Sequence, residues 1–262
     1  MPVPPPTAPV SIVTGSSRGI GRQIAAALAR DGHRLMLVAR DATALTSVAD
    51  ELRNAGSQVA TVAVDLRATG AVERVLTATE DAFGKPDVIV NNAGTAPSEK
   101  VENTTDAMLR EAFDLHVAVP LAFARTCAAD MKARGSGCLM HLASTAGLQG
   151  FAFTSAYSAA KHGMVGLVRA LHAELRPRGL HVYAVCPGFV DTDITRRAAA
   201  AIARKGRTSA DEAMVRMGEQ NRIGRMHTPA EVADAVAGLL RGRPEGCVYD
   251  LDRSPPAFLD PR

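Results

Sequence analysis

An apolar strand that runs directly into a glycine-rich turn and then a helix constrains this chain more than any other feature. Residues 10–15 read VSIVTG, and a helix is expected over 20–31. Gly15, Gly19 and Gly21 let the backbone turn tightly and approach a pyrophosphate without Cβ clashes. The start of the helix offers unpaired N–H groups and the positive end of its dipole to such a phosphate. Because strand, turn and helix follow one another in the required order, the segment predicts a dinucleotide site.

Short apolar runs alternate with helical stretches along the rest of the chain. Further buried strands are expected over 34–40, 58–66, 87–94, 138–144, 181–188 and 247–252. Further helices are expected after the second strand up to 54–55, and over 71–83, 106–134 and 156–176. This alternation predicts an α/β fold, a doubly wound parallel sheet with helices on both faces. No linker or repeat divides the sequence, so we expect a single Rossmann-type catalytic domain over 10–262.

Two segments stand apart from this alternation. Residues 1–9 contain five prolines, which forbid a helix and favour a flexible extended arm. The arm has no basic region of the kind that opens a signal peptide. Residues 190–225 are rich in Ala, Arg and Met and follow a strand end, which favours a substrate loop or lid. An ordinary pair of surface helices is the alternative for that stretch.

Composition excludes several classes of function. Thirty basic and 27 acidic residues leave a net charge of +3, too small to indicate nucleic acid or an anionic membrane as a partner. No apolar run approaches the roughly 18 residues of a membrane-spanning helix. The four cysteines (Cys127, Cys138, Cys186 and Cys247) are far apart and form no CxxC pair. That spacing argues against a metal site and favours buried free thiols in a reducing cytoplasm.

The end of the second strand indicates which dinucleotide the glycine turn would hold. A site for NAD usually has Asp or Glu there to bind the ribose hydroxyls, but this chain has Ala39 followed by Arg40. An arginine fork matches a 2′-phosphate, and Arg18 inside the turn supplies a second cation. We therefore expect NADP(H). Asp41 is an alternative ribose acceptor if the strand ends later, and Arg40 is then only a solvated strand end.

A tyrosine, a lysine and a serine supply the reactive groups. Tyr157 and Lys161 are four residues apart on an expected helix, so both side chains project from one face. A phenol is a poor acid or base at neutral pH, and we expect the Lys161 ammonium to bring the pKa of Tyr157 towards the working range. Ser144, at a strand end, is placed to hydrogen-bond a substrate oxygen. In a reduction, Tyr157 would protonate that oxygen while hydride arrives from a nicotinamide.

These motifs together resemble the classical short-chain dehydrogenases/reductases. The glycine turn over 14–21, NNAG over 91–94, Ser144, YSAAK over 157–161 and PG at 187–188 occur in the order and spacing of that family, and the resemblance covers about residues 10–240. It implies Ser144, Tyr157 and Lys161 as catalytic residues. The cofactor-binding residues that it implies are Gly15, Ser17, Arg18, Gly19, Ile20, Gly21, Arg40, Asp65, Leu66, Asn91, Ala93, Gly94, Tyr157, Lys161, Pro187, Gly188, Val190 and Thr192.

The family resemblance also implies individual roles within the cofactor site. Asp65, after the third strand, matches the residue that contacts the adenine amine. Asn91 matches one that stabilises the central sheet and lies against the cofactor. Pro187, Gly188 and Thr192 match the segment that packs on the nicotinamide and hydrogen-bonds its amide. The alternative for Asp65 and Asn91 is a packing role at a strand end.

The chain departs from the family pattern in two places. The family usually has an asparagine on the long fourth helix that completes a proton relay, and this chain has His116 there. Histidine passes protons near neutrality, so His116 is either a catalytic relay residue or a structural replacement. The second departure is the C-terminal end, where 247–252 is followed by RSPPAFLDPR without the paired glycines of relatives. Tetramer contacts usually made there are therefore in doubt.

Two helices have more apolar surface than one core needs. The residues concerned are Phe113, Leu121 and Phe123 on one helix and Met164, Leu167, Val168 and Leu171 on the other. Excess apolar faces indicate burial against another subunit, and relatives pair these helices, so we expect a homodimer or homotetramer.

The resemblance is strongest to 3-oxoacyl-acyl-carrier-protein reductases. It implies an NADPH-dependent ketoreductase that takes a small-molecule carbonyl such as a 3-oxoacyl thioester or a polyketide-like ketone. Arg134 and Arg178 sit where that subgroup contacts an acidic carrier protein, although arginine is ordinary at helix ends. One alternative is an alcohol or hydroxysteroid dehydrogenase that works in the oxidative direction. The other is a non-catalytic regulator that binds the cofactor.

Overall fold

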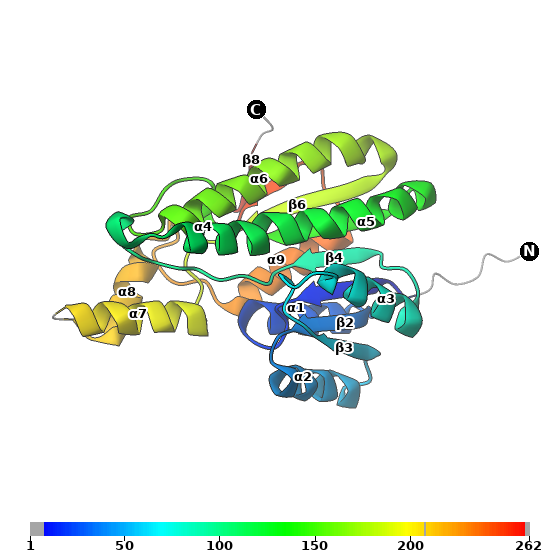
Figure 1. Ribbon diagram of the computed structural model, residues 1–262, viewed down its shortest axis with the longest axis horizontal. Helices are drawn as coiled ribbons and strands as arrows, with labels where there is room; N and C mark the ends of the chain where they lie inside the picture. The colour runs from blue at the N-terminus through cyan, green and yellow to red at the C-terminus, as the bar shows by residue number, and fades with distance from the viewer. Residues whose placement is uncertain (1–7, 207, 260–262) are drawn as a thin grey trace, which may run out of the picture.

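One sheet carries all the strands that the structure describes (Figure 1). The computed structural model describes residues 8–206 and 208–259, so most of the arm expected over 1–9 lies outside the described residues. The strands are β1 (Val10–Thr14), β2 (Arg34–Ala39), β3 (Val59–Ala63), β4 (Val88–Asn91), β5 (Gly137–Leu142), β6 (Leu180–Cys186), β7 (Val248–Asp250) and β8 (Ala257–Leu259). Their order across the sheet is β3-β2-β1-β4-β5-β6-β7-β8.

Helices connect the strands, as the alternation in the sequence predicts. They are α1 (Gly19–Arg30), α2 (Ala42–Asn54), α3 (Ala71–Phe83), α4 (Asp106–Phe113), α5 (Val119–Arg134), α6 (Ser155–Leu175), α7 (Asp193–Lys205), α8 (Ala210–Glu219) and α9 (Pro229–Gly242). Short turns of helix are η1 (Val101–Asn103), η2 (Asp114–Ala118), η3 (Thr145–Gly147) and η4 (Arg176–Arg178). Helix α9 was not expected, although Pro229 lies in its first turn and Thr228 and Glu231 form a capping box.

Strands β1 to β7 pair in parallel, which confirms the doubly wound parallel sheet. The strand order changes direction between β1 and β4, and in such sheets ligands bind at the carboxyl ends of the strands on either side of this point. β8 is a correction, because it pairs antiparallel to β7 and was not expected. Phe258 of β8 packs beside Tyr249 and beside Gly246, where there is no Cβ to exclude its ring.

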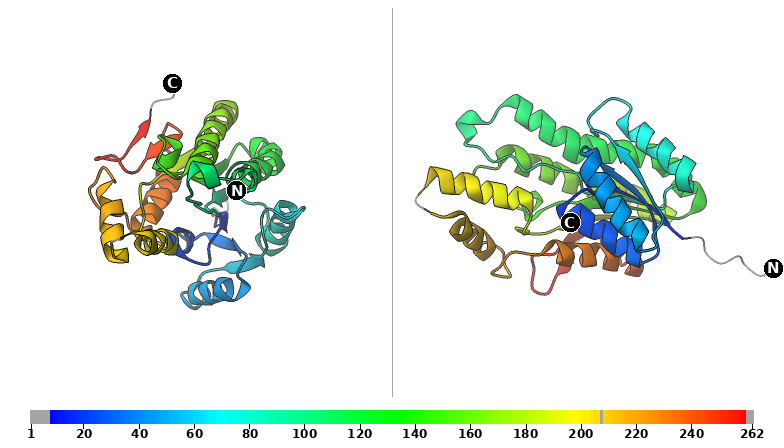
Figure 2. Two further views of the ribbon diagram at one scale, coloured as in Figure 1. Left: turned by 60° about the vertical axis from the view of Figure 1, so that its left-hand side comes forward. Right: turned by 90° about the horizontal axis from the view of Figure 1, so that it is seen from below.

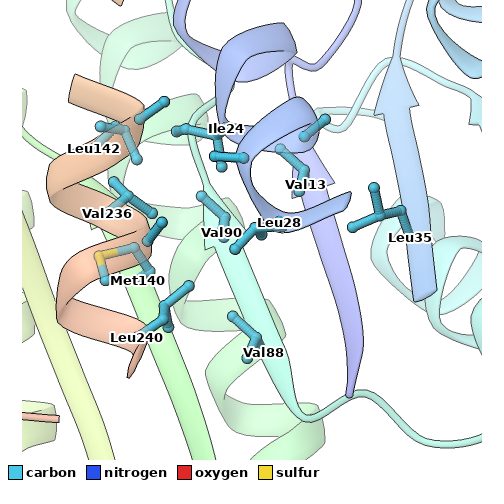
Figure 3. Close-up of a cluster of buried hydrophobic side chains, with 14 of the residues drawn as sticks. Val13, Ile24, Leu28, Leu35, Val88, Val90, Met140, Leu142, Val236 and Leu240 are labelled. Carbon is cyan, nitrogen blue, oxygen red and sulfur yellow. The ribbon is translucent and has the colours of Figure 1, made fainter. Parts of the chain in front are cut away.

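Helices cover both faces of the sheet, with a separate apolar layer on each. Successive strand side chains point to opposite faces, so Val13, Val90 and Met140 pack under α1 and α9 (Figure 3). Their neighbours Ile12 and Ile89 pack on the other face, against α3, α5 and α6. All of these strand residues are almost fully buried.

The stretch over 190–225 forms the helices α7 and α8. They follow β6 and stand apart from the helices that flank the sheet (Figure 2). Ser209 and Glu212 form a capping box at the start of α8. A small apolar cluster centred on Ala199, Ala213 and Met217 joins the two helices. This is the helix pair that the sequence offered as an alternative, and its use as a lid stays a prediction.

The long helix expected over 106–134 is interrupted near its start. Residues Asp114–Ala118 form a π turn between α4 and α5, in which Val119 N–H bonds to the Asp114 carbonyl. Single π turns widen a helix by one residue and are frequent at functional sites. His116 lies within this turn and its side chain is buried. Pro120 is the one sign of the interruption in the sequence, because it lacks a backbone N–H and lies in the first turn of α5, directly after the π turn.

Part of the apolar surface expected for subunit contact lies in the core of the chain itself. Phe123, Met164 and Val168 are buried against the sheet, so they are not available to a second subunit. Phe113 and Leu121 stay exposed, at 37% and 41%. The four cysteines are free and buried, as the sequence predicts. Among the described residues, no helix has the length and apolar character needed to cross a bilayer.

Candidate active site

Close packing explains the glycines of the turn after β1. Gly15 has φ of +66°, a conformation that disfavours side chains, and its N–H donates to the Val38 carbonyl at 2.7 Å. A Cβ on Gly15 would lie 2.8 Å from Ala93 Cα. A Cβ on Gly21 would overlap the Gly15 carbonyl. The absence of side chains at Gly15 and Gly21 therefore lets the turn, the start of α1 and the segment after β4 approach closely.

Thr14 and Asn92 hold this meeting point together. The Thr14 hydroxyl donates to the Val90 carbonyl and accepts from the N–H groups of Asn92 and Ala93, both at 3.0 Å. The Asn92 side-chain amide donates to the carbonyls of Thr14 and Gly15 at 2.9 and 3.1 Å. Sequence reasoning missed Asn92 as a site residue, although it lies within the NNAG motif.

The surroundings of the turn fit an anionic dinucleotide. Helix α1 begins after Arg18 with no side-chain cap on its first N–H groups, whereas Asp41 caps α2 by accepting from the Ala44 N–H at 3.0 Å. Arg18 and Arg40 are exposed, and neither forms an ion pair within the described part of the chain. Uncapped N–H groups and two unpaired cations suit phosphate groups. Asp41 is engaged as a helix cap, and β2 ends at Ala39 as expected.

Asp65 and Leu66 follow β3, at the same edge of the sheet. The Asp65 carboxylate accepts from Arg67 Nε at 3.1 Å and from Arg67 Nη2 at 2.8 Å. The hydrogen bonds from Arg67 lower the pKa of Asp65 to about 2. The carboxylate is therefore ionised and oriented by a neighbour that the sequence analysis did not name. Leu66 is buried in the core beneath it.

The catalytic candidates Ser144, Tyr157 and Lys161 lie together beyond the end of β5. Lys161 is buried, and its Nζ donates to the Leu142 carbonyl at 2.5 Å and lies 5.7 Å from the centre of the Tyr157 ring. Ser144 Oγ accepts from the Ala146 N–H at 3.1 Å, which fixes the hydroxyl at the start of η3. The structure thus brings the three residues into one cluster.

The protonation states of this cluster differ from the sequence-based expectation. Burial raises the pKa of Tyr157, and the interaction with the Ser144 hydroxyl works in the opposite direction. Burial also lowers the pKa of Lys161 to about 7. The expectation that Lys161 brings the phenol towards neutrality is therefore not met, because desolvation disfavours both charged forms. Tyr157 keeps its proton at neutral pH.

His116 lies against Tyr157 from the other side. Its ring is edge-on to the tyrosine ring, with 5.7 Å between the centroids. Nε2 donates to the Thr95 carbonyl at 2.8 Å, and Nδ1 is buried with no partner in the described residues. Burial and the nearby Lys161 lower the pKa of His116 to about 3. His116 is therefore a neutral imidazole beside the phenol.

A second buried histidine belongs to the same region and was missed by sequence reasoning. His141 on β5 lies opposite Asn91 on β4, whose side-chain amide approaches His141 Nδ1 at 3.4 Å. Burial and Lys161 lower the pKa of His141 to about 3. A histidine inside an apolar strand carries no motif, so only the sheet register relates it to Asn91. Asn91 itself is buried, as a residue that stabilises the sheet should be.

The segment after β6 completes the site. The Thr145 N–H donates to the Pro187 carbonyl at 2.9 Å, which joins this segment to the turn that holds Ser144. The Thr192 side chain caps α7, and its methyl group lies 3.7 Å from where a Cβ on Gly19 would be. The glycine turn, the NNAG segment, the catalytic cluster and 187–192 thus meet at the carboxyl ends of β1, β4, β5 and β6.

Comparison with known proteins agrees with this geometry. The short chain dehydrogenase family model matches residues 9–203. A Streptomyces virginiae protein assigned as the ketoacyl reductase of the monensin polyketide synthase is 34% identical over 235 residues, which covers 89% of this chain and 90% of that protein. The 3-oxoacyl-[acyl-carrier-protein] reductase of Vibrio cholerae is 29% identical, with 88% of each chain covered.

Solved structures show the same likeness. A variant of the actinorhodin polyketide ketoreductase, crystallised with NADPH, is 31% identical, with a TM-score of 0.87 over 93% of this chain and 95% of that one. The L-sorbose reductase of Gluconobacter frateurii, in complex with NADPH and L-sorbose, is 27% identical, with a TM-score of 0.86 over 93% and 94%. The chain therefore belongs to the short-chain dehydrogenases, a family of oxidoreductases.

Proposed function

We propose that this protein reduces a ketone to a secondary alcohol with NADPH. The observation that carries the proposal is the cluster of Tyr157, the buried Lys161 and Ser144 at the carboxyl ends of the strands, with Lys161 Nζ 5.7 Å from the centre of the Tyr157 ring. A group that keeps its proton at neutral pH is ready to donate it to a carbonyl oxygen that becomes an alkoxide. Relatives named as ketoacyl reductases and as an L-sorbose reductase support a carbonyl substrate.

The residues of the site divide the reaction between them. Bound NADPH supplies the hydride that the carbonyl carbon receives. Ser144 and Tyr157 hydrogen-bond the carbonyl oxygen, and the Tyr157 hydroxyl passes its proton to that oxygen as the new C–H bond forms. Lys161 Nζ lies 5.7 Å from the centre of the Tyr157 ring, so its protonated form stabilises the phenolate that is left until a proton returns. The imidazole of His116 lies edge-on against the Tyr157 ring.

Two cations support NADPH as the cofactor in place of NADH. Arg18 lies within the glycine turn and Arg40 directly after β2, and both are exposed with no ion-pair partner among the described residues. Both forks are free to bind a 2′-phosphate, to which Arg gives charge-assisted hydrogen bonds. NADPH in the crystals of two relatives agrees with this assignment. The remaining cofactor residues carry the roles implied by the family resemblance, with Asn92 added to hold the turn.

Our proposal for the substrate is a 3-oxoacyl thioester or a polyketide-like ketone. It rests on the relatives named as ketoacyl and 3-oxoacyl reductases. Carrier recognition through Arg134 has no support, because each nitrogen of its guanidinium is already bonded. Nε donates to Asp130 at 2.8 Å, Nη1 to Asp87 at 2.6 Å and Nη2 to the Pro86 carbonyl at 2.8 Å. Of the two arginines considered, only Arg178 remains for an acidic carrier.

The oxidative alternative uses the same geometry in reverse. Oxidation of an alcohol requires a base that takes the hydroxyl proton, so Tyr157 would have to be a phenolate before reaction. Burial raises the pKa of this phenol, which disfavours that state at neutral pH. The regulator alternative does not explain why Ser144, Tyr157 and Lys161 are placed together.

The test is NADPH consumption with a panel of carbonyl compounds. The panel contains 3-oxoacyl thioesters, cyclic ketones and ketose sugars, followed by nicotinamide absorbance. Turnover of the thioesters or cyclic ketones is expected, and Tyr157→Phe should lose roughly 10²–10⁴-fold in rate. Tyr249→Phe on β7 is the matched control and should keep parental activity. Absence of turnover across the panel, or more than about 10% activity in Tyr157→Phe, would contradict the proposal.

A further inference from the structure

A buried polar cluster lies under the segment after β6 and belongs to none of the motifs of the sequence. We call it the loop clamp, and it consists of Asn221, His227, Asp250 and Asp252. All four residues are at most 4% exposed. Asn221 and His227 lie between α8 and α9, whereas Asp250 and Asp252 lie at and after the end of β7. Buried polar groups require hydrogen-bond partners. The residues of the loop clamp bond to one another and to the backbone of the segment after β6.

Asn221 binds the backbone of Phe189 on both sides. Its Oδ1 accepts from the Phe189 N–H at 2.7 Å, and its Nδ2 donates to the Phe189 carbonyl at 2.9 Å. A third bond runs from Nδ2 to the Arg225 carbonyl at 2.7 Å. The side-chain amide of Asn221 thus bonds to both the N–H and the carbonyl of Phe189, as the backbone of a neighbouring strand does in a sheet. No other residue type offers an acceptor and two donors of this size, glutamine being one carbon longer.

His227 extends this pairing and connects it to the end of the sheet. Its N–H donates to the Phe189 carbonyl at 2.9 Å, and its carbonyl accepts from the Asp191 N–H at 2.9 Å. These bonds form a parallel bridge between Val190 and His227. The His227 imidazole donates from Nε2 to Asp252 Oδ1 at 3.0 Å. The loop is therefore bound to a segment that is itself bound to the chain after β7.

The carboxylates of the clamp are fixed in turn by Arg222. The Arg222 N–H donates to Asp252 Oδ2 at 3.0 Å, and its guanidinium donates to Asp250 Oδ2 at 2.7 Å. Gly188 packs directly on this group, because a Cβ there would overlap Asn221 Oδ1 and lie 2.9 Å from Asp252 Oδ1. Because Gly188 has no side chain, its backbone can lie directly against Asn221 and Asp252.

The loop has the clamp on one side and the glycine turn on the other. Thr192, two residues beyond the bridge, lies next to Gly19 of the turn. The clamp also joins the two ends of the helix pair, since α7 begins at Asp193 and α8 ends at Glu219, two residues before Asn221. The base of α7 and α8 is therefore joined by these hydrogen bonds.

We propose that Asn221 and the His227–Asp252 pair are positioning residues for NADPH. They act through the backbone of 188–192, which they hold in its binding conformation before the cofactor arrives. This rests on the proposed function, in which that segment lies against the nicotinamide. Because ordering a loop on binding costs conformational entropy, a loop that is ordered beforehand binds more tightly.

Two variants that leave the catalytic residues untouched test the proposal. Asn221→Asp keeps the size but places a carboxylate oxygen against the carbonyls of Phe189 and Arg225. His227→Leu removes the bond to Asp252, and His227→Gln restores a donor near the position of Nε2. The dissociation constant for NADPH, measured by fluorescence titration, should rise about tenfold or more in the first two variants and return towards the parent in His227→Gln. The kcat at saturating NADPH should stay within about twofold.

His181→Leu is the matched control for loss of a buried histidine. His181 lies on β6, towards the opposite end from the loop, and bonds to the Tyr183 hydroxyl at 2.9 Å. Its loss should lower thermal stability and leave the dissociation constant for NADPH unchanged. Parental affinity in folded Asn221→Asp and His227→Leu would overturn the positioning role. If the parent binds no NADPH, the proposed function fails together with this inference.

Hydrogen–deuterium exchange on the parent gives a result that does not depend on how the variants fold. The Phe189 and Asp191 N–H groups donate to Asn221 and His227, so both amides should exchange slowly without cofactor, as strand amides do. Addition of NADPH should change their exchange little. Fast exchange that becomes slow only with NADPH would show that the cofactor orders the loop, and the proposal would be wrong.

Discussion

The imidazole of His116 lies edge-on to the phenol ring of Tyr157, with 5.7 Å between centroids and 76° between the ring planes. The π turn over 114–118 directs His116 inward, and Gly94 allows the contact because a Cβ there would lie 2.6 Å from His116 Cε1. A histidine therefore occupies the position where the family resemblance leads one to expect asparagine. Its low pKa means that it takes part as a neutral hydrogen-bonding group.

His116 should add no titration to the rate between about pH 5 and 9. With a pKa of about 3, the imidazole is uncharged throughout this range. His116→Asn keeps a polar group in the turn, so its profile of kcat against pH should have the parental shape, with a rate within about tenfold. An inflection near pH 6 to 7 that is present in the parent and missing in His116→Asn would show that His116 is a proton relay that changes charge.

Lys161 should make the stability of the fold depend on pH. Its pKa falls from 10.5 to about 7 on folding, so the unfolded chain binds more protons between these values. The free energy of unfolding therefore increases as pH rises from about 7 to 10.5, and this contribution is lost as pH falls back from 10.5 to about 7, below which both states carry the proton. In Lys161→Met this part of the slope should vanish. Denaturant midpoints of parent and variant between pH 7 and 10 check the prediction, and equal slopes contradict it.

The fold followed from the sequence because its periodicity and its site motifs agree. β-branched runs separated by amphipathic stretches leave little choice but a parallel sheet, and the strand ends then bring Ser144, Tyr157 and the glycine turn to one edge. What could not be predicted depends on contacts distant in sequence. The pairing of β8 involves contacts of Phe258 with Gly246 and Tyr249. His141 can be recognised as a site residue only from its position opposite Asn91 in the sheet.

Protonation states, and polar residues that belong to no motif, also could not be predicted from the sequence. Burial shifts the pKa values of Tyr157 and Lys161, and the spacing of the two residues along a helix does not reveal how deeply they are buried. Asn221 and Asp252 are 31 positions apart and meet only at Gly188. A single sequence shows them as ordinary loop residues.

Subunit assembly should use the exposed apolar side chains of α4 and α5. Leu109, Phe113 and Leu121 are 40%, 37% and 41% exposed, more than is usual for large apolar residues on neighbouring turns. We expect at least a dimer at micromolar concentration by light scattering, and Leu121→Ser should shift it towards the monomer. Val215→Ser on α8, which is 61% exposed, is the control and should leave the mass unchanged. A monomeric parent would contradict this prediction.

The preference for NADPH over NADH should depend on the residues at the end of β2. If Arg18 and Arg40 bind the 2′-phosphate, charge-assisted hydrogen bonds of about 1.5–3 kcal/mol each should favour NADPH over NADH by tenfold or more. Asp41 does not compete as a ribose acceptor, since its carboxylate caps α2 through the Ala44 N–H. The double variant Ala39→Asp with Arg40→Ala places a carboxylate at the end of β2, where it would accept from the ribose hydroxyls and repel the phosphate.

Its preference should therefore reverse, measured as kcat/KM for both cofactors at fixed ionic strength. Arg22→Ala is the matched control, because Arg22 lies on α1 near the turn but is paired with Glu51. That variant should keep the parental preference for NADPH. A parent that uses NADH and NADPH equally well would show that neither arginine reaches the 2′-phosphate, and the assignment of both residues would be wrong.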